Sequence, residues 1–83
     1  MKEKIIGEVT HYYGGLGVVI VKFKEAVSVG DKVRFKGAHT DFVQKIKSMQ
    51  YDHKDVDKAK KGQEVGVKAD EKVHESDKVY SAE

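Results

Sequence analysis

The sequence predicts an all-β protein, and more specifically a single closed, antiparallel Greek-key barrel of roughly six strands. Short runs alternate apolar and polar side chains with the period of two that is typical of strands. These runs are rich in valine and isoleucine, and glycines or short polar stretches separate them. A chain of 83 residues can bury one small core, so we expect one domain that spans residues 1–83.

The first two expected strands form a hairpin. Residues 5–13 have the pattern of one strand, Gly14 and Gly15 supply the permissive backbone of a turn, and residues 16–23 form the next strand. The run from Val18 to Val21 is apolar on both faces. Such a strand is either covered on both sides or presents one side to a ligand or partner, and we favour burial.

The rest of the chain supplies the other strands. Val33 and Phe35 alternate with basic residues, which predicts one dry and one wet face. A phase change between Ile46 and Met49 predicts a bulge within one long strand. The charged stretch 52–61 predicts a single helical turn or a structured loop. The further strands are expected at residues 31–36, 41–51, 64–69 and 73–80, and residues 24–30 connect the second strand to the third.

Composition excludes several classes of protein. The chain has 16 basic and 14 acidic residues, no cysteine and no apolar run long enough to span a membrane, so we expect a soluble cytoplasmic protein. The phosphate-binding loop of nucleotide hydrolases is absent, and no catalytic residue, cofactor or metal site is predicted. His53 among aspartates could be a general base, but the same residues describe a solvated loop. The histidines, His11, His39, His53 and His74, lack metal-ligand spacing.

Four short motifs occur in one register along the chain. They are Gly15-Leu16-Gly17, Ser28-Val29-Gly30-Asp31, Lys47-Ser48-Met49-Gln50-Tyr51 and Gly62-Gln63-Glu64-Val65-Gly66. Together, over residues 6–80, they resemble the second-domain barrel of elongation factor Tu and its archaeal and eukaryotic counterpart, in the translation-protein barrel superfamily. A similar barrel ends some collagenase-like peptidases, and these motifs do not separate the two relatives. The barrel is expected here without a GTPase domain.

The resemblance implies a pocket, since the elongation-factor barrel holds the terminal adenosine of aminoacyl-tRNA. Val19 falls where that family places an apolar wall, and Gln50 falls where it places a glutamate beside the adenine. The change from glutamate to glutamine keeps the size and removes a charge, so the pocket could persist with altered selectivity or be vestigial. Leu16 stands where an arginine is frequent, which removes one phosphate-binding candidate.

Basic side chains alternate along the expected central strands. On exposed strands they either keep a valine-rich barrel soluble or contact RNA, with a tyrosine available to stack on an unpaired base. The residues are Lys22, Lys24, Lys32, Arg34, Lys36, Lys45 and Lys47.

The function expected from these features is that of a non-enzymatic binding module that contacts tRNA, ribosomal RNA or the translation machinery. The alternative is a protein-interaction adaptor for a GTPase, a ribosomal protein or a separately encoded peptidase. Selective contacts are predicted at Gly15, Leu16, Gly17, Val19, Gln50, His53 and Lys54, and electrostatic contacts at Lys22, Lys24, Arg34, Lys45 and Lys47.

Overall fold

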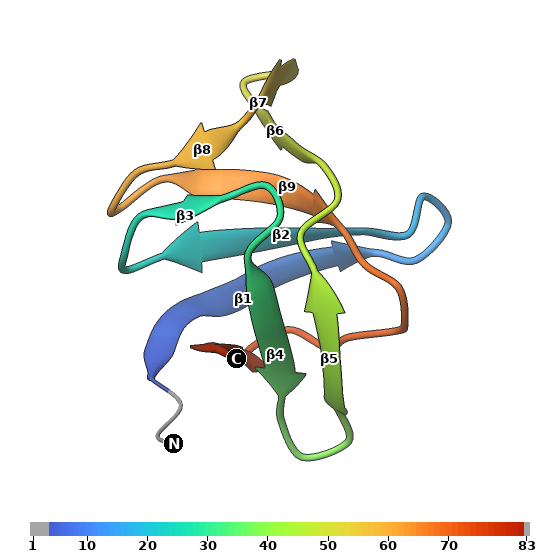
Figure 1. The fold of residues 1–83 in the computed structure, drawn as a ribbon. Helices are drawn as coiled ribbons and strands as arrows, with labels where there is room; N and C mark the ends of the chain where they lie inside the picture. Colours follow the sequence, from blue (N-terminus) through green and yellow to red (C-terminus); the bar gives the residue numbers. More distant parts are fainter. Residues whose placement is uncertain (1–3, 83) are drawn as a thin grey trace.

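A computed structural model describes residues 4–82, which form antiparallel strands connected by turns (Figure 1). An eight-stranded sheet has the order β5-β4-β10-β1-β2-β9-β6-β7, and β3 and β8 form a second, two-stranded sheet. No helix in this part of the chain is long and apolar enough to cross a membrane. The strands are β1 (Ile5–Tyr13), β2 (Val18–Phe23), β3 (Val27–Ser28), β4 (Lys32–Lys36), β5 (Asp41–Lys45), β6 (Met49–Tyr51), β7 (Lys54–Val56), β8 (Lys58–Ala59), β9 (Glu64–Lys68) and β10 (Lys78–Ser81).

The all-β, antiparallel prediction is confirmed, but the prediction of a closed barrel of about six strands is wrong. The large sheet curls into a half-barrel and remains open, because β5 and β7 end the strand order and do not pair with each other. In Figure 1, β4 and β5 run across the direction of β1, β2 and β9, which shows how strongly the sheet curls. The cytoplasmic location stays a prediction.

The first hairpin follows the sequence pattern closely. Strand β1 covers the expected residues, and β2 begins two positions later than expected, at Val18. The backbone angle that needs glycine occurs at Gly17, where φ is 67°, and not at Gly14 or Gly15. Its N–H donates to the Tyr13 carbonyl oxygen at 2.9 Å, which closes the turn.

The middle of the chain departs most from the expectation. The predicted strand 41–51 is two strands: β5 pairs with β4, and β6 pairs with β7 and β9. The interval from Ile46 to Ser48 therefore carries the chain from one edge of the sheet to the other, and is more than a bulge. Residues 52–61 contain β7 and β8 in place of a helical turn, and β8 pairs with β3 inside the expected 24–30 connection.

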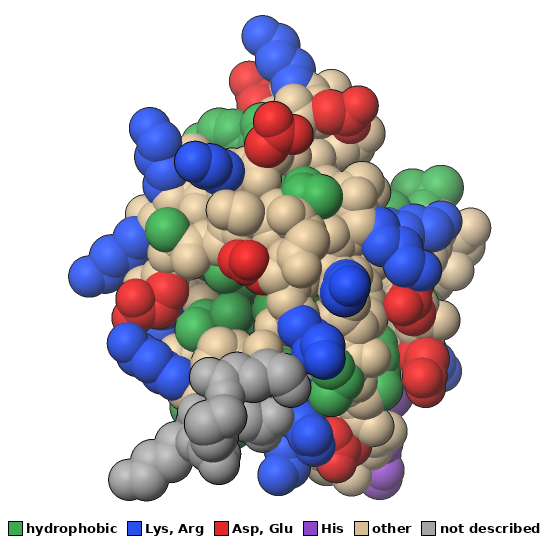
Figure 2. Space-filling model, in the orientation of Figure 1, with side chains coloured by type: hydrophobic (Ala, Val, Ile, Leu, Met, Phe, Trp, Pro, Cys, Tyr) green, Lys and Arg blue, Asp and Glu red, His purple; other side chains and the backbone are tan. Residues whose placement is uncertain are grey.

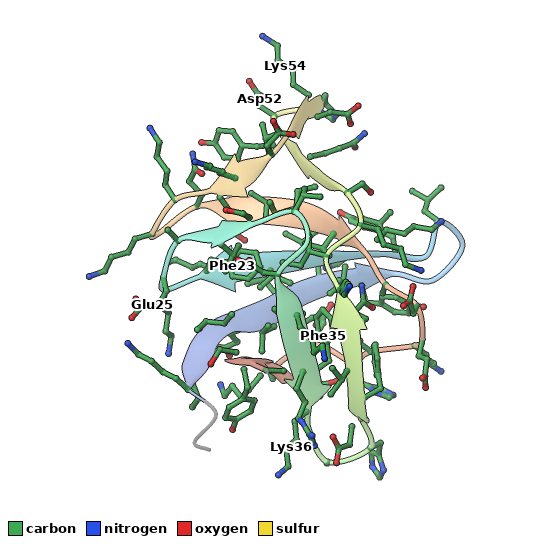
Figure 3. All side chains as sticks on the ribbon, viewed as in Figure 1. Phe23, Glu25, Phe35, Lys36, Asp52 and Lys54 are labelled. Atoms are coloured by element: carbon green, nitrogen blue, oxygen red, sulfur yellow. The ribbon has the colours of Figure 1, made fainter. Side chains whose placement is uncertain are left out.

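Alternation along the strands builds one core inside the curl. On β2, Val19, Val21 and Phe23 are buried, and on β4, Val33 and Phe35 are buried. Figure 3 shows Phe23 and Phe35 directed into the same interior from different parts of the sheet. The other buried apolar residues are Ile6, Val9, Val27, Ile46, Met49, Ala59, Val65, Val67, Val73 and Val79.

A side chain bridges part of the gap that the open sheet leaves. The Gln44 amide nitrogen donates to the Lys68 carbonyl oxygen at 2.8 Å, and the Asp70 backbone N–H donates to the Gln44 amide oxygen at 2.7 Å. Gln44 is only 4% exposed. One amide from β5 thus supplies to the end of β9 the donor and acceptor that a paired strand would supply.

Candidate functional site

A pocket of about 380 Å³ lies on the outer face of the curled sheet, over β2, β9 and β6. Its rim comes from the β1–β2 turn on one side and the β6–β7 turn on the other. The volume is that of a site for a small molecule or a side chain. The lining residues are Tyr13, Leu16, Val18, Ile20, Gln50, Asp52, His53, Glu64 and Gly66.

The floor of the pocket is open because one of its residues, Gly66 on β9, has no side chain. Val18 and Ile20 point outward, since their neighbours Val19 and Val21 fill the core. Gly66 is the register partner of Ile20 on β9. A Cβ atom at Gly66 would lie 3.4 Å from Val18 Cγ1 and 3.6 Å from Ile20 Cδ1, so any side chain here would occupy the hollow.

The β6–β7 turn forms one wall in an unusual backbone conformation. Tyr51 and Lys54 are paired, so Asp52 and His53 make a two-residue turn, with φ of 53° and 63°. Two positive φ values are typical of a type I′ hairpin turn, in which Asn-Gly is the favoured pair. The Asp-His pair costs about 1–2 kcal/mol per left-handed residue. Figure 3 shows Asp52 and Lys54 at this tip.

Hydrogen bonds hold several polar groups around the pocket. Thr10 Oγ1 donates to Glu64 Oε2 at 3.0 Å, and Gln50 Nε2 donates to Asp55 Oδ1 at 3.1 Å. On the opposite rim, Lys68 Nζ donates to the Leu16 carbonyl oxygen at 3.4 Å. The pocket therefore combines an apolar floor with a rim of fixed polar groups, which suits an amphipathic occupant.

The structure brings together some of the predicted selective residues. Leu16, Gln50 and His53 all line the pocket, although two of them are more than thirty positions from the first. Gly15 and Gly17 lie in the turn that carries Leu16. Val19 is fully buried in the core, so it contacts the interior and not the pocket. Their roles in binding stay predictions.

Sequence reasoning missed part of the lining, namely Ile20, Glu64 and Gly66. It included Val18 and Asp52 only as members of the segments 15–19 and 50–54, and Tyr13 only as a ring that could stack on a base. One signal was present, because a strand with apolar residues on both faces can present one face to a ligand. The predicted choice was burial, but Val18 and Ile20 are only partly covered.

The predicted electrostatic residues do not gather at this pocket, whose lining contains none of them. Arg34 donates to Asp41 at 3.0 Å, and Lys47 donates to Asp70 at 2.7 Å, and none of these four residues lines the pocket. Lys45 is the register partner of Lys32. Figure 2 shows Lys and Arg side chains interspersed with Asp and Glu on the face in view, so no single-sign strip forms there. The remaining members, Lys22 and Lys24, are exposed. Lys54, one of the predicted selective residues, is also exposed and does not line the pocket.

A second polar cluster joins the β4–β5 loop to the turn before β10. Thr40 Oγ1 lies 3.1 Å and Asp77 Oδ2 lies 3.9 Å from the same nitrogen, Nδ1 of His74. A hydroxyl nucleophile and an orienting carboxylate would have to use the two different ring nitrogens. The Asp77 carboxylate instead accepts the His74 backbone N–H at 2.9 Å, which makes the cluster a turn support.

Comparisons with known proteins find similarity to parts of proteins that are named protease or collagenase. No family model matches the sequence. The chain is 41% identical over 76 residues to an uncharacterized protease of Methanocaldococcus jannaschii and 33% identical over 82 residues to a collagenase of Porphyromonas gingivalis. These matches cover 90% and 95% of the chain. The chain spans about a fifth of the length of these curated relatives, 19% and 20%.

Comparison with solved structures gives a similar result. The C-terminal domain of a Geobacillus thermoleovorans protein, named as a U32 peptidase, superposes with a TM-score of 0.90 at 22% identity. The superposition covers 96% of this chain and 93% of that domain. A second structure, the selenomethionine variant of the same domain, gives a TM-score of 0.87.

These matches contradict the resemblance to the translation-protein barrel. The predicted binding module for RNA or the translation machinery is wrong, and the prediction of a non-enzymatic module is contradicted, because the relatives are named protease and collagenase. The motifs that suggested a translation barrel, such as Val29-Gly30-Asp31, are turn chemistry shared by unrelated β-proteins. The sequence is similar to part of a protease and the fold is that of a U32 peptidase C-terminal domain, not of the second domain of elongation factor Tu.

Proposed function

We propose that this chain is a peptidase-associated domain that binds polypeptide for the protease of which such domains are part. The observation that carries the proposal is the 41% identity to an uncharacterized protease over 90% of this chain. Because the match occupies only 19% of that protein, the chain corresponds to a component of it. We infer that such a component contributes to the larger protein by recognising polypeptide.

The pocket and the nearby sheet edge support binding of an extended polypeptide. Strand β7 is an edge strand of the large sheet, and it follows directly after the turn that carries Asp52 and His53. An extended peptide can add to such an edge through main-chain hydrogen bonds while one side chain enters a neighbouring pocket. Leu16, 68% exposed, and Tyr51, 42% exposed, add apolar surface to the same region.

The test is an amide NMR titration of the isotopically labelled 83-residue chain with one protein in two forms. The ligand protein is used once unfolded, after reduction and carboxymethylation, and once natively folded. We expect the unfolded form to shift signals of Leu16, Ile20, Gln50, Val56 and Gly66, and the folded form to leave them unchanged. Absence of shifts with the unfolded form, and with gelatin as a second unfolded probe, would overturn the proposal.

A pocket-filling variant is the matched control. Gly66→Ala places a methyl group on the floor at ordinary contact distances, so the fold should persist. In a strand, replacing glycine by alanine also tends to stabilise, by about 0.5–1 kcal/mol. We expect weaker binding of unfolded polypeptide with equal or higher thermal stability. Equal binding by the variant would place the polypeptide elsewhere on the domain.

A further inference from the structure

We infer that the pocket receives a basic side chain, lysine or arginine, of the bound polypeptide. The inference rests on the proposed function and adds the chemical class of the residue that the domain selects. It follows from three properties of the lining: an apolar floor, an aromatic wall, and two carboxylates without cationic partners. Each property fits one part of a basic side chain.

The floor and wall suit the aliphatic stem. Val18 and Ile20 present methyl groups to the hollow that Gly66 leaves open. Lysine and arginine bury their methylene groups along such surfaces while their charged ends stay polar. Tyr13, which also lines the pocket, contributes an aromatic ring, and the faces of such rings attract cations. A shorter polar side chain would leave the floor uncovered.

The rim suits the charged end. Asp52 and Glu64 contribute carboxylates, and the lining has no lysine or arginine, although the chain contains 16 of them. No ion pair joins either carboxylate to a cation within residues 4–82. Glu64 has one oxygen occupied by the Thr10 hydroxyl, a neutral partner that leaves the negative charge uncompensated.

Two neighbouring lysines do not fill this role. Lys22 is the register partner of Glu64, but the two side chains form no ion pair in the described structure. Lys68 directs its ammonium group to the Leu16 carbonyl oxygen on the far rim, at 3.4 Å. The two carboxylates therefore remain available to a cation that enters from outside. The attraction between that cation and the carboxylates becomes stronger as water leaves the pocket, because the local dielectric constant falls.

The two carboxylates can be neutralised without disturbing the fold. Glu64→Gln keeps an oxygen that accepts the Thr10 hydrogen bond, and Asp52→Asn suits the positive φ of this turn position. The double variant removes both charges from the rim. The matched control is Asp57→Asn with Glu71→Gln, which removes two exposed carboxylates outside the lining.

The experiment measures dissociation constants by NMR for synthetic extended peptides that differ at one central position. That position is lysine, or norleucine, which has the same stem without the charge. We expect the lysine peptide to bind about tenfold more tightly than the norleucine peptide, as one charge-assisted hydrogen bond implies. The preference should disappear in the Asp52→Asn, Glu64→Gln variant and persist in the control variant.

The outcomes separate the two proposals. Equal binding of the lysine and norleucine peptides would overturn the basic-residue inference while the polypeptide-binding proposal stands. The same holds if the lysine preference survives in the double variant, since the charge would then be read elsewhere. If no peptide and no unfolded protein shifts any signal, the proposed function itself fails, and the inference fails with it.

Discussion

Single side chains can stabilise the curvature of an open sheet by bridging strands that do not pair, and Gln44 is the main example. Its amide contacts both the Lys68 carbonyl oxygen and the Asp70 N–H across the gap between β5 and the end of β9. The side chain is buried, so these bonds form where water cannot readily replace them. Lys47 and Asp70 add an exposed ion pair next to this bridge, at 2.7 Å.

We predict that Gln44→Met destabilises the fold by about 1–3 kcal/mol, because two backbone groups lose their partners and the side-chain volume is kept. The measurement is the free energy of unfolding from a urea titration. Gln50→Met is the control, since the Gln50 side chain is exposed and its amide donates to Asp55, and the change should alter stability by about 0.5 kcal/mol or less. Equal effects at the two positions would contradict the bridging role.

Gly37 allows the buried Asp77 side chain to pack directly against the backbone. A Cβ atom at this position would overlap the carboxylate of Asp77, which is buried and accepts the His74 N–H. We predict that Gly37→Ala destabilises by about 1–3 kcal/mol, the usual range for overpacking. Gly15→Ala, with nothing within 4 Å of the added atom, serves as control in the same thermal unfolding assay. A neutral Gly37→Ala would show that the turn before β10 can move aside.

At the scale of elements, the β6–β7 hairpin stores strain beside the pocket. Asp52 and His53 both have positive φ, and glycine at the second position would relieve part of that cost. Strain at a site wall is retained where the side chains are needed, which agrees with Asp52 as a ligand-facing group. His53 contributes to the same wall.

We predict that His53→Gly raises the free energy of unfolding by about 0.5–1 kcal/mol, because glycine adopts the left-handed conformation without a Cβ penalty. Lys54→Gly, one position later in β7, is the control and should destabilise by a similar amount, since glycine is unfavourable within a strand. Chemical denaturation of both variants checks the signs. Loss of stability in His53→Gly would mean that the imidazole itself supports the hairpin.

At the scale of the whole molecule, the last strand lies inside the large sheet and not at its edge. Strand β10 lies between β1 and β4, so it joins the first hairpin to the β4–β5 pair. Val79 is fully buried and contributes to the core from this position. In contrast, the connection before β10 is exposed at Asp70, Glu71 and Lys72.

We predict that deletion of residues 78–83 abolishes the cooperative unfolding transition seen by circular dichroism, because the sheet would divide into two parts. The control is an insertion of equal length, made of glycine and serine, after Glu71. Exposed loops tolerate such insertions at a cost of roughly 1 kcal/mol or less. A cooperative transition in the truncated chain would show that β1 and β4 can pair without β10.

Local pattern was enough wherever a strand was long and alternating. Residues 5–13 and 64–68 follow the predicted strands closely. Along 64–68 every second side chain is buried, which is the pattern that predicts a strand. The pattern failed at the short strands β3, β7 and β8, which have two or three residues and few buried side chains. Those strands form because tertiary pairing supplies their partners, as β3 finds β8.

The sequence alone determined the all-β class, the first hairpin and the dry face formed by Val33 and Phe35, since these depend on periodicity and turn chemistry close in the chain. Tertiary structure decided which strands pair with each other and that the sheet stays open. It also decided that Leu16, Gln50, His53 and Gly66 surround one pocket. The physical reason is that strand order and pocket shape arise from contacts between distant residues, to which no local period corresponds. The similarity to part of a protease likewise emerged from comparison of the whole chain, because the short motifs of this sequence are turn signals that many β-proteins share.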